Sequence, residues 1–302
     1  MIRFGQDEAH IRMFVKKDGI SRKIDMHLKK TKAKGIAIDG IPIRKASELF
    51  GILNIVFFSP EDLNIIKSGP GERRRFMDLE LCQLNKLYLS NLSSYNRILN
   101  QRNKLLKDIA FQPGLKDTLE VWDEQLAHYG AFLIESRKAF VEELNDIMEG
   151  IHRSITGDRE QIKLVYEPSV QSSVFLEELT NARERDIRFK MTSLGPHRDD
   201  LCVKVNEIDI RKYGSQGQQR TAALSLKLSE IYMVKKIIKD MPVLLLDDVL
   251  SELDSNRQNY LLNSIRQVQT MITCTGLDDF IDKRFHTNTI FKVIDGDVFC
   301  PS

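Results

Sequence analysis

Residues 241–254 read M-P-V-L-L-L-D-D-V-L-S-E-L-D, a short apolar run that leads directly into two adjacent aspartates. A run of this length, bounded by proline and acidic residues, is typical of a strand buried on both faces of a parallel sheet. Such a strand ends where it reaches solvent, and ligands of α/β proteins bind beside the carboxyl ends of their strands. The sequence therefore predicts that Asp247 and Asp248 lie at a ligand-binding edge.

This arrangement is that of a Walker B motif. In that interpretation Asp247 holds Mg²⁺ directly or through water, and Asp248 polarises the water that attacks a γ-phosphate, so both are candidate catalytic residues. The alternative is a strand that simply runs into an acidic turn. The segment upstream favours the first interpretation.

That segment, G-S-Q-G-Q-Q-R at 214–220, opens a predicted helix over 216–239. Ser215 suits an N-cap, and the free backbone N–H groups of the first turn together with the helix dipole attract an anion. Ser215, Gln216, Gly217 and Gln218 are therefore candidates for contact with a γ-phosphate. A plain capped helix remains the alternative.

The rest of the chain divides into three parts. Residues 1–72 predict a β-meander followed by a buried strand near 53–58. Residues 73–190 are mainly helical, with helices predicted over 73–111 and 115–154 around a turn at 112–114; each helix would be about 55 Å long, enough for a projecting arm. Residues 191–302 alternate helix and strand, which indicates a largely parallel sheet. Two helices folded onto an ordinary globule are the alternative to an arm.

Composition indicates a folded globular protein. Of 302 residues, 42% are hydrophobic and 29% charged, and the net charge is only +2, so any attraction to nucleic acid must come from local patches. The basic candidates for contact with DNA phosphates are Lys29, Lys30, Lys32, Arg73, Arg74 and Arg75. The four cysteines lack metal-ligand spacing and predict reduced thiols of a cytoplasmic protein, and no apolar run approaches the roughly 20 residues that span a bilayer.

Several segments together make the sequence resemble a known family. Besides the two motifs above they are F-F-S-P-E-D-L at 57–63, R-R-R-F-M-D at 73–78 and G-P-H-R-D-D-L at 195–201. With them the chain resembles the RecF family of bacterial DNA replication and repair proteins, which are related to the heads of Rad50 and SMC proteins. The resemblance implies an α/β fold: an ABC-type ATPase head of the SMC/Rad50 kind with an inserted helical-hairpin arm domain.

The same resemblance implies a function and further site residues. A protein of this kind binds ATP with Mg²⁺, binds single-stranded or gapped DNA without sequence preference, and forms a homodimer when ATP is bound. It assists the loading of RecA through RecR and associated mediators, and it also assists the SOS response. The signature residues 215–218 would contact the nucleotide of the other subunit, Ser251 and Asp254 would form the D-loop at the dimer interface, and Thr275 would sense the γ-phosphate.

One family motif is missing from this sequence, because no G-x-x-x-x-G-K-[ST] phosphate loop occurs in it. Without the N–H groups and lysine of that Walker A loop, the β- and γ-phosphates lose their main cradle. The resemblance leads us to expect that the start codon was placed too late or that the protein is truncated, and the start of the sequence in the middle of the family pattern favours the former. Two alternatives to an ATPase stay open: a DNA-binding remnant that neither binds nor hydrolyses ATP, and a metal-dependent nuclease that uses Asp247 and Asp248.

Overall fold

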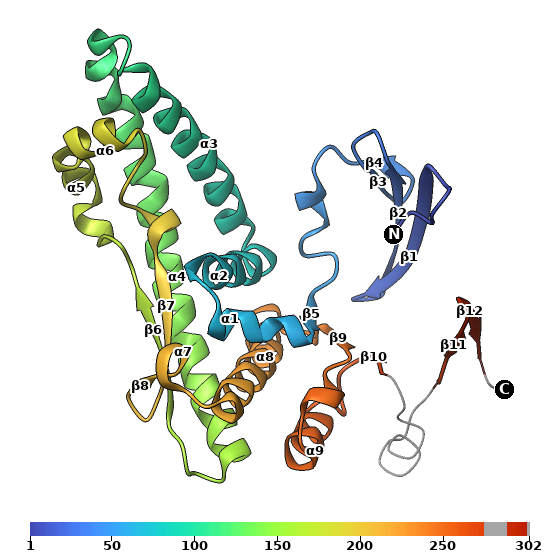
Figure 1. The fold of residues 1–302 in the computed structure, drawn as a ribbon. Coiled ribbons are helices and arrows are strands. Elements are labelled where there is room, and N and C mark those ends of the chain that lie inside the picture. The colour runs from blue at the N-terminus through green and yellow to red at the C-terminus, as the bar shows by residue number, and fades with distance from the viewer. Residues whose placement is uncertain (275–288, 301–302) are drawn as a thin grey trace.

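The computed structural model describes residues 1–274 and 289–300, and a small parallel sheet carries the acidic motif (Figure 1). Its strands are β5 (Ile55–Phe58), β9 (Val243–Asp247) and β10 (Thr270–Thr273), in the order β10-β9-β5. Both neighbours run parallel to β9, as the alternation of helix and strand predicts. The apolar run of β9 is thus the central strand of the three.

One face of this sheet is buried and the other is not. Leu244 and Leu246 of β9 pack against α8 (Gln216–Ile238) and α9 (Ser255–Ser264), which cover that face. On the opposite face Phe57 is 49% and Met271 is 65% exposed. The expectation of a strand buried on both faces is therefore wrong for the described residues, because these helices cover only one side.

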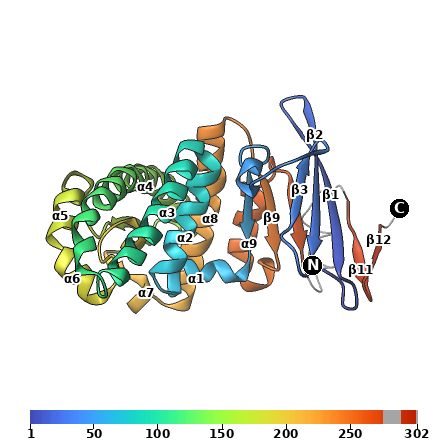
Figure 2. The same cartoon turned by 90° about the horizontal axis from the view of Figure 1, so that it is seen from above.

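The amino-terminal β-meander is confirmed. It consists of β1 (Glu8–Lys17), β2 (Ile20–Lys29), β3 (Gly35–Ile38) and β4 (Ile41–Pro42), paired antiparallel in chain order. Asp18 and Gly19 both have positive φ, at 50° and 77°, as the mirror-image turns of tight hairpins require. Its apolar face forms a small separate core. In both views the meander and the helical arm lie on opposite sides of β5 and β9 (Figures 1 and 2).

The helical arm is built differently from the prediction. Instead of one helix over 73–111 there are two, α2 (Pro70–Leu84) and α3 (Lys86–Asp108), with α1 (Leu63–Lys67) before them. The break is at Asn85, which has an extended backbone and accepts hydrogen bonds from the N–H groups of Leu87 and Tyr88. An N-cap side chain at this position ends one helix and starts the next. The apolar spacing continues across the break and conceals it.

The second arm helix, α4 (Leu119–Thr156), has 38 residues and is about 57 Å long at 1.5 Å per residue. It runs beside α3, and the two extend together from the head (Figure 1). Two short helices, α5 (Phe175–Asn181) and α6 (Arg183–Phe189), pack against them. The arm interior contains an ion cluster, in which Arg102 contacts Asp123 and Asp186 at 2.7 Å and all three side chains are fully buried.

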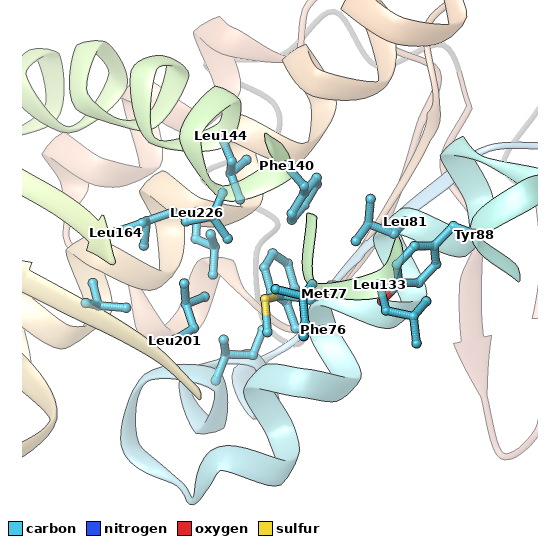
Figure 3. Close-up of a cluster of buried hydrophobic side chains, with 14 of the residues drawn as sticks. Phe76, Met77, Leu81, Tyr88, Leu133, Phe140, Leu144, Leu164, Leu201 and Leu226 are labelled. Carbon is cyan, nitrogen blue, oxygen red and sulfur yellow. The ribbon is translucent and has the colours of Figure 1, made fainter. Parts of the chain in front are cut away.

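The base of the arm is continuous with the head. Strand β6 (Ile162–Glu167) pairs with β7 (Asp200–Val205), which pairs with β8 (Ile208–Asp209), so the expected boundary at residue 190 divides a sheet. Figure 3 shows the core where this sheet, α2, α4 and α8 meet. Its labelled side chains are Phe76, Met77, Leu81, Tyr88, Leu133, Phe140, Leu144, Leu164, Leu201 and Leu226.

Shorter elements complete the described chain. The single helical turn α7 (Ile210–Tyr213) precedes α8, and the terminal hairpin pairs β11 (Lys292–Ile294) with β12 (Asp297–Phe299). The 3-10 turns are η1 (Ala46–Leu49), η2 (Pro60–Asp62), η3 (Pro113–Thr118), η4 (Ser172–Val174), η5 (Pro196–Arg198) and η6 (Leu250–Glu252).

Candidate functional site

The two aspartates of the acidic motif lie at the carboxyl end of β9, as predicted. Asp247 is the last residue of the strand and is exposed, whereas Asp248 is half-buried and begins the following loop. Asp248 has a left-handed backbone with φ 51°. Its Oδ1 is buried without a hydrogen-bond partner among the described residues. Unpartnered buried oxygens and unusual backbone angles are both found more often at functional sites.

Thr273, at the end of the neighbouring strand β10, orients both aspartates. Its hydroxyl donates to Asp247 Oδ1 at 2.5 Å and accepts from the backbone N–H of Asp248 at 3.2 Å, and its carbonyl accepts from the same N–H at 3.1 Å. An exposed carboxylate beside a second carboxylate with a free oxygen suits a hard divalent cation such as Mg²⁺ and its water shell. Thr275, the predicted phosphate sensor, lies outside the described residues.

The signature segment begins α8 as a complete N-terminal cap. Ser215 Oγ accepts from the N–H of Gln218 at 3.2 Å, and Gln218 Oε1 accepts from the N–H of Ser215 at 3.0 Å. This is a capping box in which each side chain satisfies the other residue's backbone. Ser215 and Gln216 are exposed and Gly217 is half-buried, so the first turn faces solvent.

A series of polar contacts connects this cap to the arm helix α4. Gln218 Nε2 donates to Glu160 Oε1 at 3.0 Å, and the other oxygen of Glu160 lies 3.4 Å from His152 Nε2. His152, on α4, is fully buried and is hydrogen-bonded through Nδ1 to Ser225 of α8 at 3.0 Å. Burial lowers the pKa of His152, and the nearby Glu160 partly offsets the change. The signature cap is therefore bonded to the base of the arm.

The D-loop contacts the signature helix through Arg257. Asp254 caps α9 by accepting from the N–H groups of Asn256 and Arg257 at 3.1 and 3.0 Å. The bond from the Arg257 N–H lowers the pKa of this carboxyl, and the Arg257 guanidinium, which also pairs with it, adds to the effect. The same guanidinium donates to Thr221 Oγ1 at 2.9 Å and to the carbonyl of Gly217 at 3.3 Å.

Ser251 closes the loop after Asp248 by donating to its carbonyl at 2.8 Å. Within the described residues no hydrogen bond or ion pair joins Asp247 or Asp248 to Ser215, Gln216, Gly217 or Gln218. The two aspartates are thus not bonded directly to residues 215–218, although Arg220 of the signature segment donates to Glu252, after the acidic pair, at 2.6 Å.

Three of the expected DNA-binding residues lie at the end of β2 and just beyond it. Lys29, Lys30 and Lys32 are all exposed. Lys29 lies 3.5 Å from Glu8, and Lys30 lies 3.2 Å from Asp7. Exposed pairs of this kind are weak and exchange readily for other anions.

The arginine run on α2 separates into one buried and two accessible residues. Arg73 is 1% exposed, and its guanidinium group donates to both carboxylate oxygens of Asp200, at 2.6 and 3.0 Å. The expectation that Arg73 faces DNA is therefore corrected, since its charge is already neutralised in the interior. Arg74 and Arg75 instead line a cavity of about 400 Å³ at the junction of α2, α3 and α4. Burial and the neighbouring Arg137 lower the pKa of Arg74.

The segment G-P-H-R-D-D-L forms a structural junction beside this cavity. Asp199 is fully buried and bonds Arg137 at 3.1 Å and the N–H of Ser169 at 2.8 Å. His197 is bonded to Tyr95 at 2.7 Å, and burial lowers its pKa to about 4. These contacts give the turn a structural role.

Three residues of the site were missed by sequence reasoning. Thr273, Glu160 and Arg257 act through partners between 25 and 58 positions away in the chain. Only Thr273 had a signal, because it ends the strand after the acidic motif. Among the described residues, no helix has both the length and the apolar character needed to cross a bilayer.

Comparisons with known proteins agree on one family. No family model matches the chain. It is 64% identical over 300 residues to the DNA replication and repair protein RecF of Lachnospira eligens, covering 99% of this chain and 83% of that protein. It is equally identical over 298 residues to the RecF protein of Agathobacter rectalis, covering 82% of it.

Solved structures give the same assignment. The recombination mediator protein RecF in the RecFOR pathway, solved as RecF-ATP, superposes with a TM-score of 0.89 at 35% identity, covering 99% of this chain and 82% of that one. An SMC head bound to the C-terminal winged-helix domain of ScpA superposes with a TM-score of 0.52 at 14% identity, covering 98% of this chain and 75% of that one. The second match concerns the fold alone and confirms an ABC-type head. The chain therefore belongs to the RecF family of DNA replication and repair proteins.

Proposed function

We propose that this protein is an ATP-dependent DNA-binding protein of recombinational repair that works as a nucleotide-bridged homodimer in the cytoplasm. The observation that carries the proposal is the pair Asp247 and Asp248 at the end of β9, with Thr273 orienting both and one buried Asp248 oxygen unpartnered. A solved relative is described as RecF-ATP, which supports ATP as the ligand.

Each residue has a separate task in this proposal. Asp247 would hold Mg²⁺, which neutralises phosphate charge when bound. Asp248 would accept a hydrogen bond from the attacking water and so orient it. Ser215 to Gln218 would contact the γ-phosphate held by the other subunit, with the N–H groups of Gln216 and Gly217, which the capping box does not use, as donors. Ser251 and Asp254 would lie at the dimer interface, and Thr275 would sense the γ-phosphate. Ser215 and Gln216 are exposed at the first turn of α8, which supports contact with a nucleotide held by another subunit.

The rival function is a DNA-binding remnant without nucleotide chemistry. It is favoured by the lack of a G-x-x-x-x-G-K-[ST] motif in the sequence given. Filter binding with labelled ATP and Mg²⁺ separates the two. The nucleotide sequence upstream of Met1, translated in frame, should be read for such a motif, and any longer reading frame assayed beside the chain as given. Retention of ATP supports the ATPase, and failure of both forms to retain it establishes the remnant.

The catalytic assignment is tested with Asp248→Asn and Asp247→Asn, matched to Asp240→Asn at the other end of β9. Asp248→Asn should lower ATP turnover by roughly 100-fold or more, the usual loss for a missing general base, and should leave ATP retention intact. Asp247→Asn should weaken the Mg²⁺ dependence of binding. Turnover by Asp248→Asn at the rate of Asp240→Asn would refute the assignment, and DNA cleavage with Mg²⁺ but no ATP would indicate a nuclease instead.

Action between subunits is tested by mixing two inactive variants. Ser215→Arg blocks the signature surface and Asp248→Asn blocks the acidic one, so each homodimer lacks both composite sites. In an equal mixture half of the dimers are mixed and each has one intact site of two, so activity should recover to roughly a quarter of the unmodified rate. No recovery would show that both motifs act on the same nucleotide from one chain.

We propose that DNA contacts the exposed cations Lys29, Lys30 and Lys32, and Arg74 and Arg75 at the cavity. Phosphate contacts make binding depend steeply on salt, and each one removed should lower the slope of log K against log salt by about 1. Lys32→Gln and Arg75→Gln should do so on gapped and single-stranded DNA, whereas Lys163→Gln on β6 should not. An unchanged slope in the first two would exclude these residues from the interface.

The proposed partners are RecR and its associated mediators, through which the protein would assist RecA loading and the SOS response. A solved relative is named as a mediator of the RecFOR pathway, which supports the choice. Co-sedimentation with purified RecR, with and without gapped DNA and ATP, measures the association. RecA filament assembly on coated gapped DNA then tests loading.

A further inference from the structure

The outward face of the β1–β2 hairpin carries two histidines and a glutamate at adjoining positions. Side chains two apart in a strand point to the same face, so Glu8 and His10 lie together on β1. The antiparallel register places His27 of β2 directly opposite His10. The other face of the hairpin is the apolar one that contains Val15 and Ile24, so the three polar residues project away from the core.

The three side chains are already in contact. The imidazole rings of His10 and His27 stack with centroids 3.9 Å apart, and His27 Nε2 lies 2.8 Å from Glu8 Oε2. One ligand atom from each of the three residues lies within 4.8 Å of the others. The next position across the sheet is Gly35, opposite His27, which has no side chain to cover the cluster. Solvent and ions therefore have access to it.

Two cationic side chains lie near the cluster, and each has an acidic partner. Arg12, two residues beyond His10, is bonded to Asp25 at 2.6 Å, so its charge is compensated. Lys29 lies 3.5 Å from Glu8 Oε2 and competes for that carboxylate. The Lys29 side chain is 38% exposed and flexible, so it can turn into solvent when another cation takes its place.

We propose that Glu8, His10 and His27 bind a divalent transition-metal ion of the zinc class and clamp β1 to β2. Two imidazoles and one carboxylate are the ligands that Zn²⁺ takes in open tetrahedral sites, with water in the fourth position, whereas Mg²⁺ and Ca²⁺ prefer oxygen. Metal–ligand bonds of about 2.1 Å set tetrahedral ligand atoms about 3.4 Å apart. Small rotations of exposed side chains close the cluster to that size.

The site lies on an outer strand and is separate from the acidic motif on β9. In the described sheet β1 is the terminal strand, bonded only to β2. A metal that joins residues from both strands resists separation of this edge, because binding to the folded hairpin alone stabilises it. The ion therefore supports the meander structurally, and ATP chemistry does not depend on it.

The test is metal binding by the whole protein after removal of metals with a chelator, at pH 7.5. Zinc sulfate is titrated in competition with a fluorescent zinc chelator, and Co²⁺ is added separately to record its ligand-field spectrum. The unmodified protein should bind one equivalent at this site. His10→Ala and His27→Ala should each weaken it by roughly 100-fold or more, beyond the loss typical of a second-shell partner.

Two further variants distinguish a built site from general histidine affinity. His128→Ala removes an exposed histidine from α4 and should leave binding unchanged. Lys29→Met removes the competing ammonium and should tighten binding. The proposal is overturned if His10→Ala and His27→Ala bind zinc as the unmodified protein does, or if Co²⁺ shows strong thiolate charge transfer, which would place the metal on cysteines. Circular dichroism of each variant verifies that the fold is retained.

Discussion

Replacing Arg102 by methionine should strongly destabilise the arm. Its Nε bonds Asp123 at 2.7 Å, and one terminal nitrogen bonds Asp186 at 2.7 Å and Thr192 at 2.9 Å, all in the interior. Methionine keeps much of the side-chain volume, so the change removes mainly the charge. Asp123 retains Arg183 at 2.6 Å, but within residues 1–274 and 289–300 Asp186 retains only the N–H and hydroxyl of Ser193.

The magnitude follows from that uncompensated carboxylate. Removing one partner of a buried ion pair typically costs about 3–5 kcal/mol, a large part of the roughly 5–15 kcal/mol that holds a domain folded. The matched control is Arg12→Met. Arg12 bonds Asp25 at 2.6 Å, but its side chain is 62% exposed. Solvent screens such surface pairs and leaves them with little effect on stability, so this change should be nearly silent.

The assay is urea unfolding followed by circular dichroism, with hydrogen exchange to locate the effect. Arg102→Met should lower the unfolding midpoint and raise exchange in α3, α4 and α6, and adding Asp186→Asn should restore part of the loss because it removes the orphaned charge. Equal midpoints for Arg102→Met and Arg12→Met would refute the reasoning. So would a double variant no more stable than the single one.

Three further predictions follow from single contacts. In α4, Gly130→Ala should lower the free energy of unfolding by about 1–3 kcal/mol, because its Cβ would overlap the ring of Phe175 and lie 3.0 Å from Tyr95 Cε2. The control is Gly150→Ala on the same helix, whose Cβ meets nothing within 4 Å and which should stabilise the protein by roughly 0.5–1 kcal/mol. Thermal melts that rank the two variants the other way would contradict this. Burial lowers the pKa of His197 to about 4, below its unfolded value, so its contribution to stability is present above about pH 6.5 and is lost as pH falls toward 4. Urea unfolding midpoints should therefore fall less steeply with pH across that window in His197→Gln than in the unmodified protein. Equal slopes would show that His197 does not cause the pH dependence. Arg257→Met should weaken ATP-dependent dimerisation in analytical ultracentrifugation, because it frees Asp254 from the signature helix. Arg266→Met, at an exposed position just after α9, is the control that should not.

Much of the fold was predictable because its signals are local. The apolar run 243–246 and the acids after it identify a strand and its ligand-binding end without any knowledge of neighbouring strands. The capping box of Ser215 and Gln218 is complete within four residues. The same holds for the turn at Asp18 and Gly19, where a tight hairpin needs residues that accept positive φ.

The helix break at Asn85 shows where local signals fail. Leu81, Leu84 and Tyr88 keep helical spacing on both sides of it, so periodicity alone predicts one helix. The structure uses the Asn85 side chain as a cap instead, because ending α2 there allows it to pack across the head while α3 follows α4 into the arm.

The amino-acid sequence alone indicated the family, the acidic and signature motifs, and the alternation of elements, since each signal is carried by short segments whose residues are neighbours in the chain. Only the tertiary structure decided that Arg73 is an interior residue paired with Asp200, that Arg257 joins the D-loop to the signature helix, and that Glu8, His10 and His27 form a cluster. A charged side chain looks the same in sequence whether it faces water or a distant partner. Its role is set by which partner the folded backbone brings within hydrogen-bonding distance, because desolvating a charge is tolerated only where such a partner is present.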